Sequence, residues 1–243
     1  MRVIVAEDTQ AAAAVAADII EKIVREEPDC TLGLATGSSP VAMYRELIRR
    51  CKDEGLDFSV IHTVNLDEYV GLDGSHEQSY RYFMNTNLLD HINIDKSNTF
   101  VVKATGDIEA NLKEFNDILD NTDIRIQLLG VGPDGHLGFD ELGAVLYDKA
   151  HQGTLDDSTI EANKRFFESK EEVPTKALTM GMGNIMRAKE LLMIIGGNKE
   201  TAARKLLTEE MIDPLCPATF LRLHRNATVI IEKELADRIG YKY

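Results

Sequence analysis

The stretch TLGLATGSSPVAMYRELIRRC, residues 31–51, contains the strand, turn and helix that decide the fold. Residues 31–37 form an apolar run that ends in a glycine, which predicts a buried strand followed by a tight turn. In the remainder, the apolar residues recur with helical spacing on one stripe: Tyr44, Leu47, Ile48 and Cys51. A strand followed directly by a helix is the repeating unit of α/β proteins.

The same alternation occurs on both sides of this stretch. Residues 2–7 form a β-branched run, Asp8 and Thr9 are suitable helix caps, and helical spacing follows at Ala12, Val15, Ala16, Ile19, Ile20 and Ile23. Further apolar runs cover residues 60–66, 100–103, 124–132, 177–183, 191–197 and 227–233. This alternation predicts an α/β fold, a mainly parallel sheet with helices on both faces.

The chain shows no internal repeat or flexible linker, so we expect a single domain over residues 1–243. Residues 143–176 are polar with weak periodicity. A long irregular stretch inside a compact domain is more often functional than not, which predicts a lid or insertion there.

Composition excludes several classes of protein. The 243 residues are 44% hydrophobic, enough for a buried core, while the apolar start is interrupted at Asp18, well short of the roughly 20 residues of a membrane span. Cys30, Cys51 and Cys216 are odd in number and widely spaced, which favours a reducing cytoplasm over a disulfide framework or zinc ribbon. A net charge of −14 without a basic stripe disfavours nucleic-acid binding.

Chemistry-bearing residues follow four of the predicted strands. They are ATGSSP (35–40), NLDEYVG (65–71), GVGPDGHLGFDE (130–141) and GGNK (196–199). In open α/β sheets, ligands bind outside the carboxyl ends of the strands. These four segments are therefore the place to look for a functional site.

Two of these segments have the parts of an anion site. Gly37 permits a tight turn, Ser38 or Ser39 can cap a helix, and Pro40 suits the first helical position, so backbone amides would be free to bind a phosphate. A capped helix start without a ligand is the alternative, and the Gly-Lys-Ser/Thr ending of a P-loop is missing. Lys199, expected in the first turn of its helix, opposes the helix dipole unless a bound anion compensates.

The segment GVGPDG, residues 130–135, matches the pattern G-x-G-x-x-G. Pro133 interrupts the helix that a dinucleotide fingerprint requires, and a further glycine follows, so a nucleotide site is disfavoured. The glycines instead allow Asp134 and His136 to project into a crowded site, although a structural turn is the alternative. A histidine beside carboxylates suits general acid–base chemistry.

The adjacent acids of NLDEYVGL, residues 65–72, stand where a hydrophobic strand stops. Two carboxylates at the ligand-binding edge of a sheet suggest a functional role, while solvated loop acids are the alternative. A divalent metal on Asp67, Asp134, His136 and Glu141 would match no recognised zinc pattern, so we expect no metal.

Together, LATGSSP, NLDEYVGL, GVGPDGHLGFDE, KRFFESKEEVPTKALTMGMG and GGNK resemble, in order and spacing, the glucosamine-6-phosphate deaminase family. The resemblance covers nearly the whole chain. It implies a Rossmann-like sheet, a small sugar phosphate as substrate, and conversion of glucosamine 6-phosphate and water to fructose 6-phosphate and ammonia. It also implies that no organic cofactor takes part.

The resemblance implies a role for each matching residue. His136 would move the proton between the O1 hydroxyl and the ring oxygen O5, with Asp134 and Glu141 orienting it. Asp67 would take the proton from C2 of the opened sugar and return it at C1. The phosphate group would be bound by Gly37, Ser38, Ser39, Arg165 and Lys199.

The chain departs from the family after Phe139. Asp140, Glu141 and Leu142 stand where the family usually has Asn-Glu-Pro. Larger family members that are allosteric hexamers carry serines and basic residues where this chain has Ala144, Val145, His151 and Gly153, so we expect a non-allosteric enzyme and leave the oligomeric state open. The alternatives are deamination of galactosamine 6-phosphate, lactone hydrolysis as in 6-phosphogluconolactonases, and a sugar-phosphate sensor without turnover.

Overall fold

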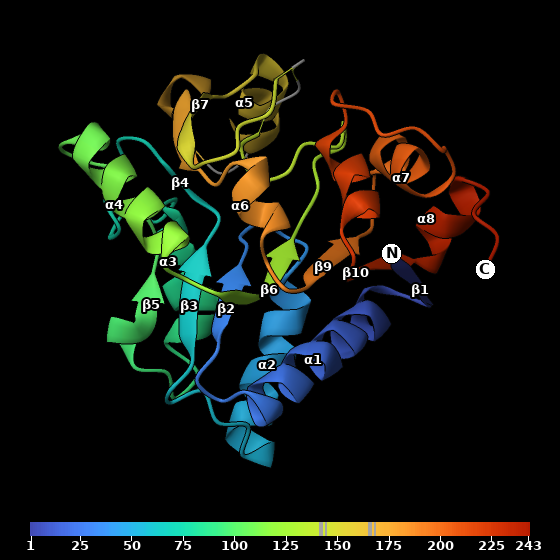
Figure 1. The fold of residues 1–243 in the computed structure, drawn as a ribbon, viewed down its shortest axis with the longest axis horizontal. Coiled ribbons are helices and arrows are strands. Elements are labelled where there is room, and N and C mark those ends of the chain that lie inside the picture. The colour runs from blue at the N-terminus through green and yellow to red at the C-terminus, as the bar shows by residue number, and fades with distance from the viewer. Residues whose placement is uncertain (141–142, 144, 165–166, 168) are drawn as a thin grey trace.

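The computed structural model describes residues 1–140, 143, 145–164, 167 and 169–243. Its main element is a sheet of seven strands, all paired in parallel, in the order β1-β10-β9-β6-β2-β3-β5 (Figure 1). The prediction of an α/β fold with a mainly parallel sheet is confirmed. The strands are β1 (Arg2–Ala6), β2 (Thr31–Leu34), β3 (His62–Asn65), β5 (Thr99–Phe100), β6 (Ile124–Leu129), β9 (Leu191–Ile195) and β10 (Ala227–Glu232).

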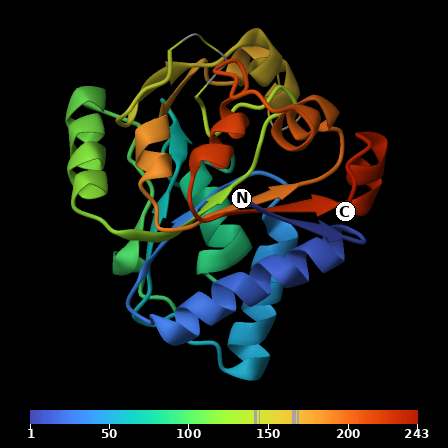
Figure 2. The same cartoon turned by 45° about the vertical axis from the view of Figure 1, so that its right-hand side comes forward.

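Helices cover both faces of this sheet. Helices α1 and α2 pack together on one face, and α4 and α6 lie on the other (Figure 2). The helices are α1 (Thr9–Glu26), α2 (Val41–Glu54), α3 (Tyr80–Met84), α4 (Ile108–Asp120), α5 (Asp157–Asn163), α6 (Met182–Met186), α7 (Glu200–Leu207) and α8 (Lys233–Arg238). A π-helical turn at Asn85–Leu89 and 3-10 turns at Lys96–Asn98, Lys170–Glu172 and Pro217–Leu223 complete the helical structure. Within the described ranges, no helix is long and apolar enough to cross a membrane.

The helix starts test the capping predictions. At α1 the Asp8 carboxylate accepts the Ala11 N–H at 2.8 Å, as expected, a contact that contributes about 1 kcal/mol. At α2 the prediction was wrong, because Pro40 is the residue before the helix and not its first member. Ser38 and Ser39 lie in the turn that follows Gly37, whose φ of +91° only glycine adopts readily, and they cap nothing.

A second, antiparallel sheet stands over the carboxyl ends of the main strands (Figure 1). It consists of β4 (Asp67–Tyr69), β8 (Lys176–Thr179) and β7 (His151–Thr154), in the order β4-β8-β7. The apolar run at 177–183, which we expected to be a strand of the parallel sheet, instead forms β8 and then turns into α6. Its pairing partners, β4 and β7, both precede it in the chain by more than 20 residues, so no local pattern indicates this antiparallel pairing.

The region 143–176 contains more regular structure than its polar sequence suggests. It includes β7 and α5, which lie at the top of the molecule in Figure 1, above the carboxyl edge of the main sheet. That it closes over a substrate remains a prediction.

Candidate active site

The strand order places the four chemistry-bearing segments at one edge of the sheet. After β2 the chain adds β3 and β5 in one direction, whereas after β6 it adds β9 and β10 in the other. The reversal falls between the neighbouring strands β2 and β6, and ligands of α/β proteins bind at such a switch point. The segment 35–39 follows β2 and the segment 130–136 follows β6, so the topology brings them together.

His136 and Asp134 form the centre of the segment after β6. Asp134 Oδ1 lies 2.8 Å from His136 Nδ1 and also accepts the His136 backbone N–H at 3.2 Å. Burial alone would raise the pKa of Asp134, but the hydrogen bond and charge of His136 outweigh it and lower the pKa to about 2. Asp134 therefore stays ionised at neutral pH and fixes the orientation of the imidazole.

Gly132 is required by the position of this imidazole. A Cβ at residue 132 would lie 2.2 Å from His136 Cε1 and 2.7 Å from Asp134 Oδ1, closer than any real Cβ contact. The same glycine donates its N–H to the His136 carbonyl at 3.0 Å. The glycine pattern thus serves close packing of an acid–base pair, as the sequence indicated, and no helix follows it in the described residues.

Asp67 is a buried carboxyl group facing the same turn. Its exposed fraction is 5%, and a Cβ at Gly138 would lie 3.3 Å from Asp67 Oδ2, so this oxygen borders the turn that follows His136. Burial first, and then the charge of Glu68, raise the pKa of Asp67 well above its usual value, and no hydrogen bond from the described chain offsets them. A carboxyl group with a raised pKa can act as base and then as acid at one place.

Glu68 has a different role from its neighbour. Its carboxylate accepts the backbone N–H groups of Tyr69, Tyr80 and Arg81 at 2.9, 2.9 and 3.0 Å. It therefore holds the start of α3 and does not face the turn after His136. The two adjacent acids are separated because successive side chains of a strand point to opposite faces.

Lys199 reaches the segment after β6. Its Nζ donates to the Val131 carbonyl at 2.6 Å. We expected it in the first turn of the helix, whereas it is the residue immediately before α7. On the other side of the switch point, Gly37 and Ser38 are exposed and Ser39 is half-buried. A cation and a turn with two serine hydroxyl groups thus follow the two strands that flank β6.

An aromatic cluster of Tyr69, Tyr80 and Phe139 lies beside Asp67 and was not predicted from the sequence. The Tyr80 ring stacks on Phe139 at 5.8 Å between centroids and lies 4.9 Å from Tyr69. Burial, with the nearby Tyr69 and the charge of Asp67, raises the pKa of Tyr80 well above its usual value, and its side chain hydrogen-bonds to Thr36. In the sequence, Tyr69 of the NLDEYVGL motif is the one signal of this cluster that stands close to Asp67. It makes the surroundings of Asp67 apolar.

Four residues of interest lie outside the described residues: Glu141, Leu142, Ala144 and Arg165. The proposed roles of Glu141 and Arg165 therefore stay predictions. Among the residues that the structure does describe, no three histidine, cysteine or acidic side chains gather as they would around a metal ion.

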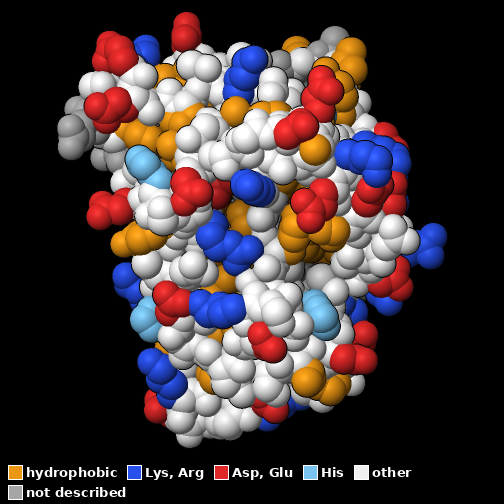
Figure 3. Space-filling view, turned by 90° about the vertical axis from the view of Figure 1, so that its left-hand side faces the viewer, with side chains coloured by type: hydrophobic (Ala, Val, Ile, Leu, Met, Phe, Trp, Pro, Cys, Tyr) orange, Lys and Arg blue, Asp and Glu red, His pale blue; other side chains and the backbone are white. Residues whose placement is uncertain are grey.

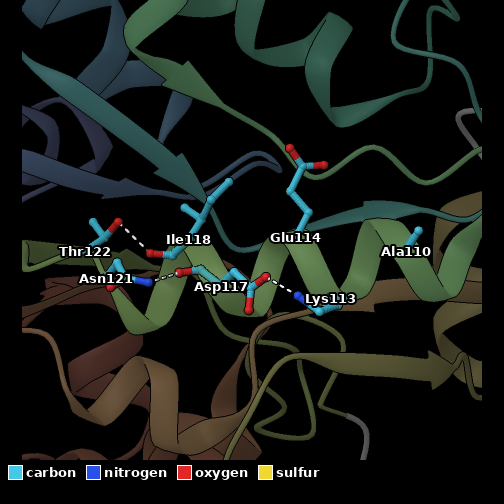
Figure 4. Close-up of a pocket in the computed structure, with 7 residues that line it drawn as sticks. All are labelled: Ala110, Lys113, Glu114, Asp117, Ile118, Asn121 and Thr122. Carbon is cyan, nitrogen blue, oxygen red and sulfur yellow. Dashed lines mark hydrogen bonds and ion pairs between the residues drawn. The ribbon is translucent and has the colours of Figure 1, made fainter.

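Two surface hollows lie away from this edge. One runs along α4 and is bordered by Ala110, Lys113, Glu114, Asp117, Ile118, Asn121 and Thr122. Figure 4 shows Lys113 bonded to Asp117, while Asn121 and Thr122 donate to the carbonyl groups of Asp117 and Ile118. On the face that carries α4, acidic and basic side chains are interspersed (Figure 3). Neither this hollow nor the polar one at the amino ends of β2 and β3 contains a predicted site residue.

Comparisons with known proteins agree with this geometry. The family model described as glucosamine-6-phosphate isomerases/6-phosphogluconolactonase matches residues 6–230. The chain is 46% identical to the glucosamine-6-phosphate deaminase of Clostridium perfringens over 238 residues, 97% of this chain and 98% of that protein. It is 44% identical to that of Clostridium beijerinckii over 241 residues, 98% of this chain and 100% of the relative.

Solved structures show the same relationship. A monomeric glucosamine-6-phosphate deaminase superposes with a TM-score of 0.94 at 40% identity, covering 98% of this chain and 99% of the other. The 6-phosphogluconolactonase from Trypanosoma brucei superposes with a TM-score of 0.77 at 16% identity and 98% coverage of both chains, so it shares the fold.

Proposed function

The chain belongs to the family of glucosamine-6-phosphate isomerases and 6-phosphogluconolactonases, and we propose that it converts glucosamine 6-phosphate and water to fructose 6-phosphate and ammonia. The observation that carries the proposal is the pairing of two acid–base groups at one turn. His136 is held by Asp134, and Asp67 is buried beside Gly138. Deaminases at 41–46% identity over nearly the whole chain support the same reaction.

The two groups divide the proton transfers. His136, oriented by the ionised Asp134, moves the proton between O1 and O5 and opens the ring. Asp67 removes the proton from C2 and delivers it to C1, leaving an imine at C2 that adds water and expels ammonia. Asp67 suits this task because its raised pKa makes both protonation states accessible, and because the aromatic cluster limits water around it. Glu141 assists His136 in this proposal.

The phosphate group is bound at the two neighbouring strand ends. The turn of Gly37, Ser38 and Ser39 supplies amides and hydroxyl groups, and Lys199 supplies positive charge, with Arg165 as a second cation. Local donors of this kind bind an anion despite the net charge of −14, because distant surface charges are screened by salt.

We further propose that the enzyme acts as a monomer in the cytoplasm, without allosteric activation. A monomeric deaminase at 40% identity supports the first point, and three cysteines that form no disulfide support the second. Hyperbolic kinetics that N-acetylglucosamine 6-phosphate leaves unchanged, and a sedimentation mass near 27.1 kDa, are the expected results.

A substrate comparison tests the reaction. The purified protein is incubated in parallel with glucosamine 6-phosphate, galactosamine 6-phosphate and 6-phosphogluconolactone, and ammonia, ketose phosphate and acid are measured in each. We expect ammonia and fructose 6-phosphate in equal amounts from the gluco substrate. Preferential turnover of the galacto epimer would reassign the sugar, acid production from the lactone would reassign the reaction class, and binding without turnover would indicate a sensor.

A further inference from the structure

Asp140 is a buried acid at the end of the turn that follows His136. Its exposed fraction is 3%, and its backbone N–H donates to the Leu137 carbonyl at 3.0 Å, closing the turn 137–140. Its Oδ1 lies 3.4 Å from Nε2 of His151 in β7, and its carboxyl group also hydrogen-bonds to the Met182 backbone. The proposed proton transfers make no use of this acid, so its burial needs another explanation.

The small sheet places His151 in one row with Asp67. Asp67 of β4 pairs with Thr179 of β8, and Thr179 pairs with His151 of β7. Side chains of directly paired residues lie on the same face of a sheet, with neighbouring strands about 5 Å apart. Asp67, Thr179 and His151 therefore form a row about 10 Å long on one face.

The turn 137–140 lies along this row. Gly138 borders Asp67 Oδ2 and Thr179 Oγ1, and the Phe139 N–H donates to Thr179 Oγ1 at 3.1 Å. At the His151 end of the row, Asp140, the last residue of the turn, contacts His151. The position of the turn relative to Asp67 is thus fixed by polar contacts at its middle and at its end.

His151 is itself held in place. The Tyr147 ring stacks on the imidazole with 3.9 Å between centroids and an interplanar angle of 23°. A Cβ at Gly153 would lie 3.0 Å from the Phe139 carbonyl, so β7 packs directly against the turn. The imidazole is consequently a fixed partner for Asp140 and not a mobile surface group.

We propose that Asp140 and His151 are positioning residues whose contact holds the turn that follows His136 against the small sheet. The inference rests on the proposed function, because it assigns the pair to the deaminase site. An asparagine at position 140 would accept the same hydrogen bonds but could not exchange a proton. The carboxyl group of Asp140 therefore couples the state of the turn to pH.

The protonation states follow from burial. Burial raises the pKa of Asp140 to about 7, against a hydrogen bond from the Met182 backbone. Burial also lowers the pKa of His151, against a hydrogen bond with the Lys149 backbone. Among the described residues, the Tyr147 phenol ring faces His151, and Asp67 lies at the other end of the same row. Loss of the Asp140 proton as pH rises through about 7 places a net negative charge beside the site.

Three variants and one spectrum test this proposal. Asp140→Asn keeps the hydrogen bonds and removes the proton, Asp140→Ala removes both, and His151→Gln keeps a donor without an imidazole. We measure kcat and KM for glucosamine 6-phosphate at a series of pH values spanning neutrality. In parallel, the ¹⁵N resonances of the His151 ring are titrated in the wild type and in Asp140→Asn.

The expected results separate positioning from general stability. Asp140→Ala lowers kcat about 10-fold or more with a smaller change in KM, whereas Asp140→Asn and His151→Gln stay within about threefold of wild type at acidic pH. The decline of wild-type kcat above neutral pH is absent from Asp140→Asn, and the His151 titration differs between the two proteins. Equal pH profiles and equal His151 titrations in wild type and Asp140→Asn would overturn the proposal. The ring titration needs no turnover, so it stands even where the proposed reaction fails.

Discussion

Replacing Asp67 by asparagine is expected to lower activity strongly and at the same time stabilise the fold. The folded state keeps the Asp67 carboxyl buried, with a pKa raised by burial and by Glu68, and the described chain supplies no hydrogen bond to its charged form. An unpaired buried charge costs on the order of several kcal/mol. Asparagine has nearly the same shape without the charge, so Asp67→Asn should raise the free energy of unfolding by about 1–3 kcal/mol at alkaline pH.

The sign of the pH dependence follows from the direction of the shift. A carboxyl group whose folded pKa exceeds its unfolded pKa binds its proton more tightly in the folded state. Wild-type stability is therefore full below the unfolded value of about 3.9 and falls as pH rises toward the folded value. The difference between variant and wild type should be near zero in acid and reach about 2–10 °C in melting temperature at alkaline pH.

Glu68→Gln is the matched control, since it removes the adjacent buried carboxylate. The N–H groups of Tyr69, Tyr80 and Arg81 donate to the Glu68 carboxylate, and glutamine offers them one acceptor oxygen in place of two. We therefore expect the free energy of unfolding to fall by about 1–3 kcal/mol and most of the activity to be retained. Asp67→Asn should lower kcat by about 100-fold to 10,000-fold. Thermal unfolding across pH and ammonia release provide the two readouts. An Asp67→Asn protein that is less stable than wild type at alkaline pH, or that keeps most of its kcat, would refute the reasoning.

Three further substitutions test individual contacts. Gly132→Ala places a Cβ 2.2 Å from His136 Cε1, so kcat should fall more than about 10-fold while circular dichroism stays native; an unchanged kcat would contradict the required close packing. Lys199→Met should raise KM for the sugar phosphate about 10-fold or more and change kcat less, and an equal loss in kcat would assign Lys199 to the chemistry instead. Gly135→Ala should destabilise the protein by about 2 kcal/mol or more, because residue 135 has φ +105° and a Cβ there would lie 2.2 Å from Cys216 Sγ. Adding Cys216→Ala should restore part of that stability in urea titrations, and a purely additive double variant would locate the strain in the backbone alone.

The main sheet was predictable because its inner strands, such as β6 and β9, are mostly buried on both faces. Runs such as residues 191–197 read as continuous apolar segments, and the strand–helix alternation then restricts the topology to parallel crossovers. Ligands of open α/β sheets bind at the carboxyl ends of the strands, and this rule also located the segments that carry Asp134, His136 and Lys199. The predicted start of α2 was wrong, because Pro40 precedes the helix.

The small sheet was not predictable from local pattern. Strand β4 has only three residues, two of them acidic, and it pairs with β8 more than 100 residues later. The local pattern does not separate Asp67 from Glu68, and only the family resemblance assigned the proton transfer to Asp67. In the structure the two side chains point to opposite faces because both residues lie in β4. The link between Asp140 and His151 depends on the same sheet. From the sequence, Asp140 was identified only as a departure from the family pattern, and no partner was predicted for it.

The most direct test of the account compares binding and turnover in wild type and Asp67→Asn. Glucosamine 6-phosphate binding is measured by calorimetry, and ammonia and fructose 6-phosphate are measured under saturating substrate. We expect both proteins to bind the sugar phosphate with similar affinity, the wild type to release the two products in equal amounts, and the variant to release them at least about 100-fold more slowly. Wild-type turnover by Asp67→Asn would show that another group moves the C2 proton, and that Asp67 is not the base.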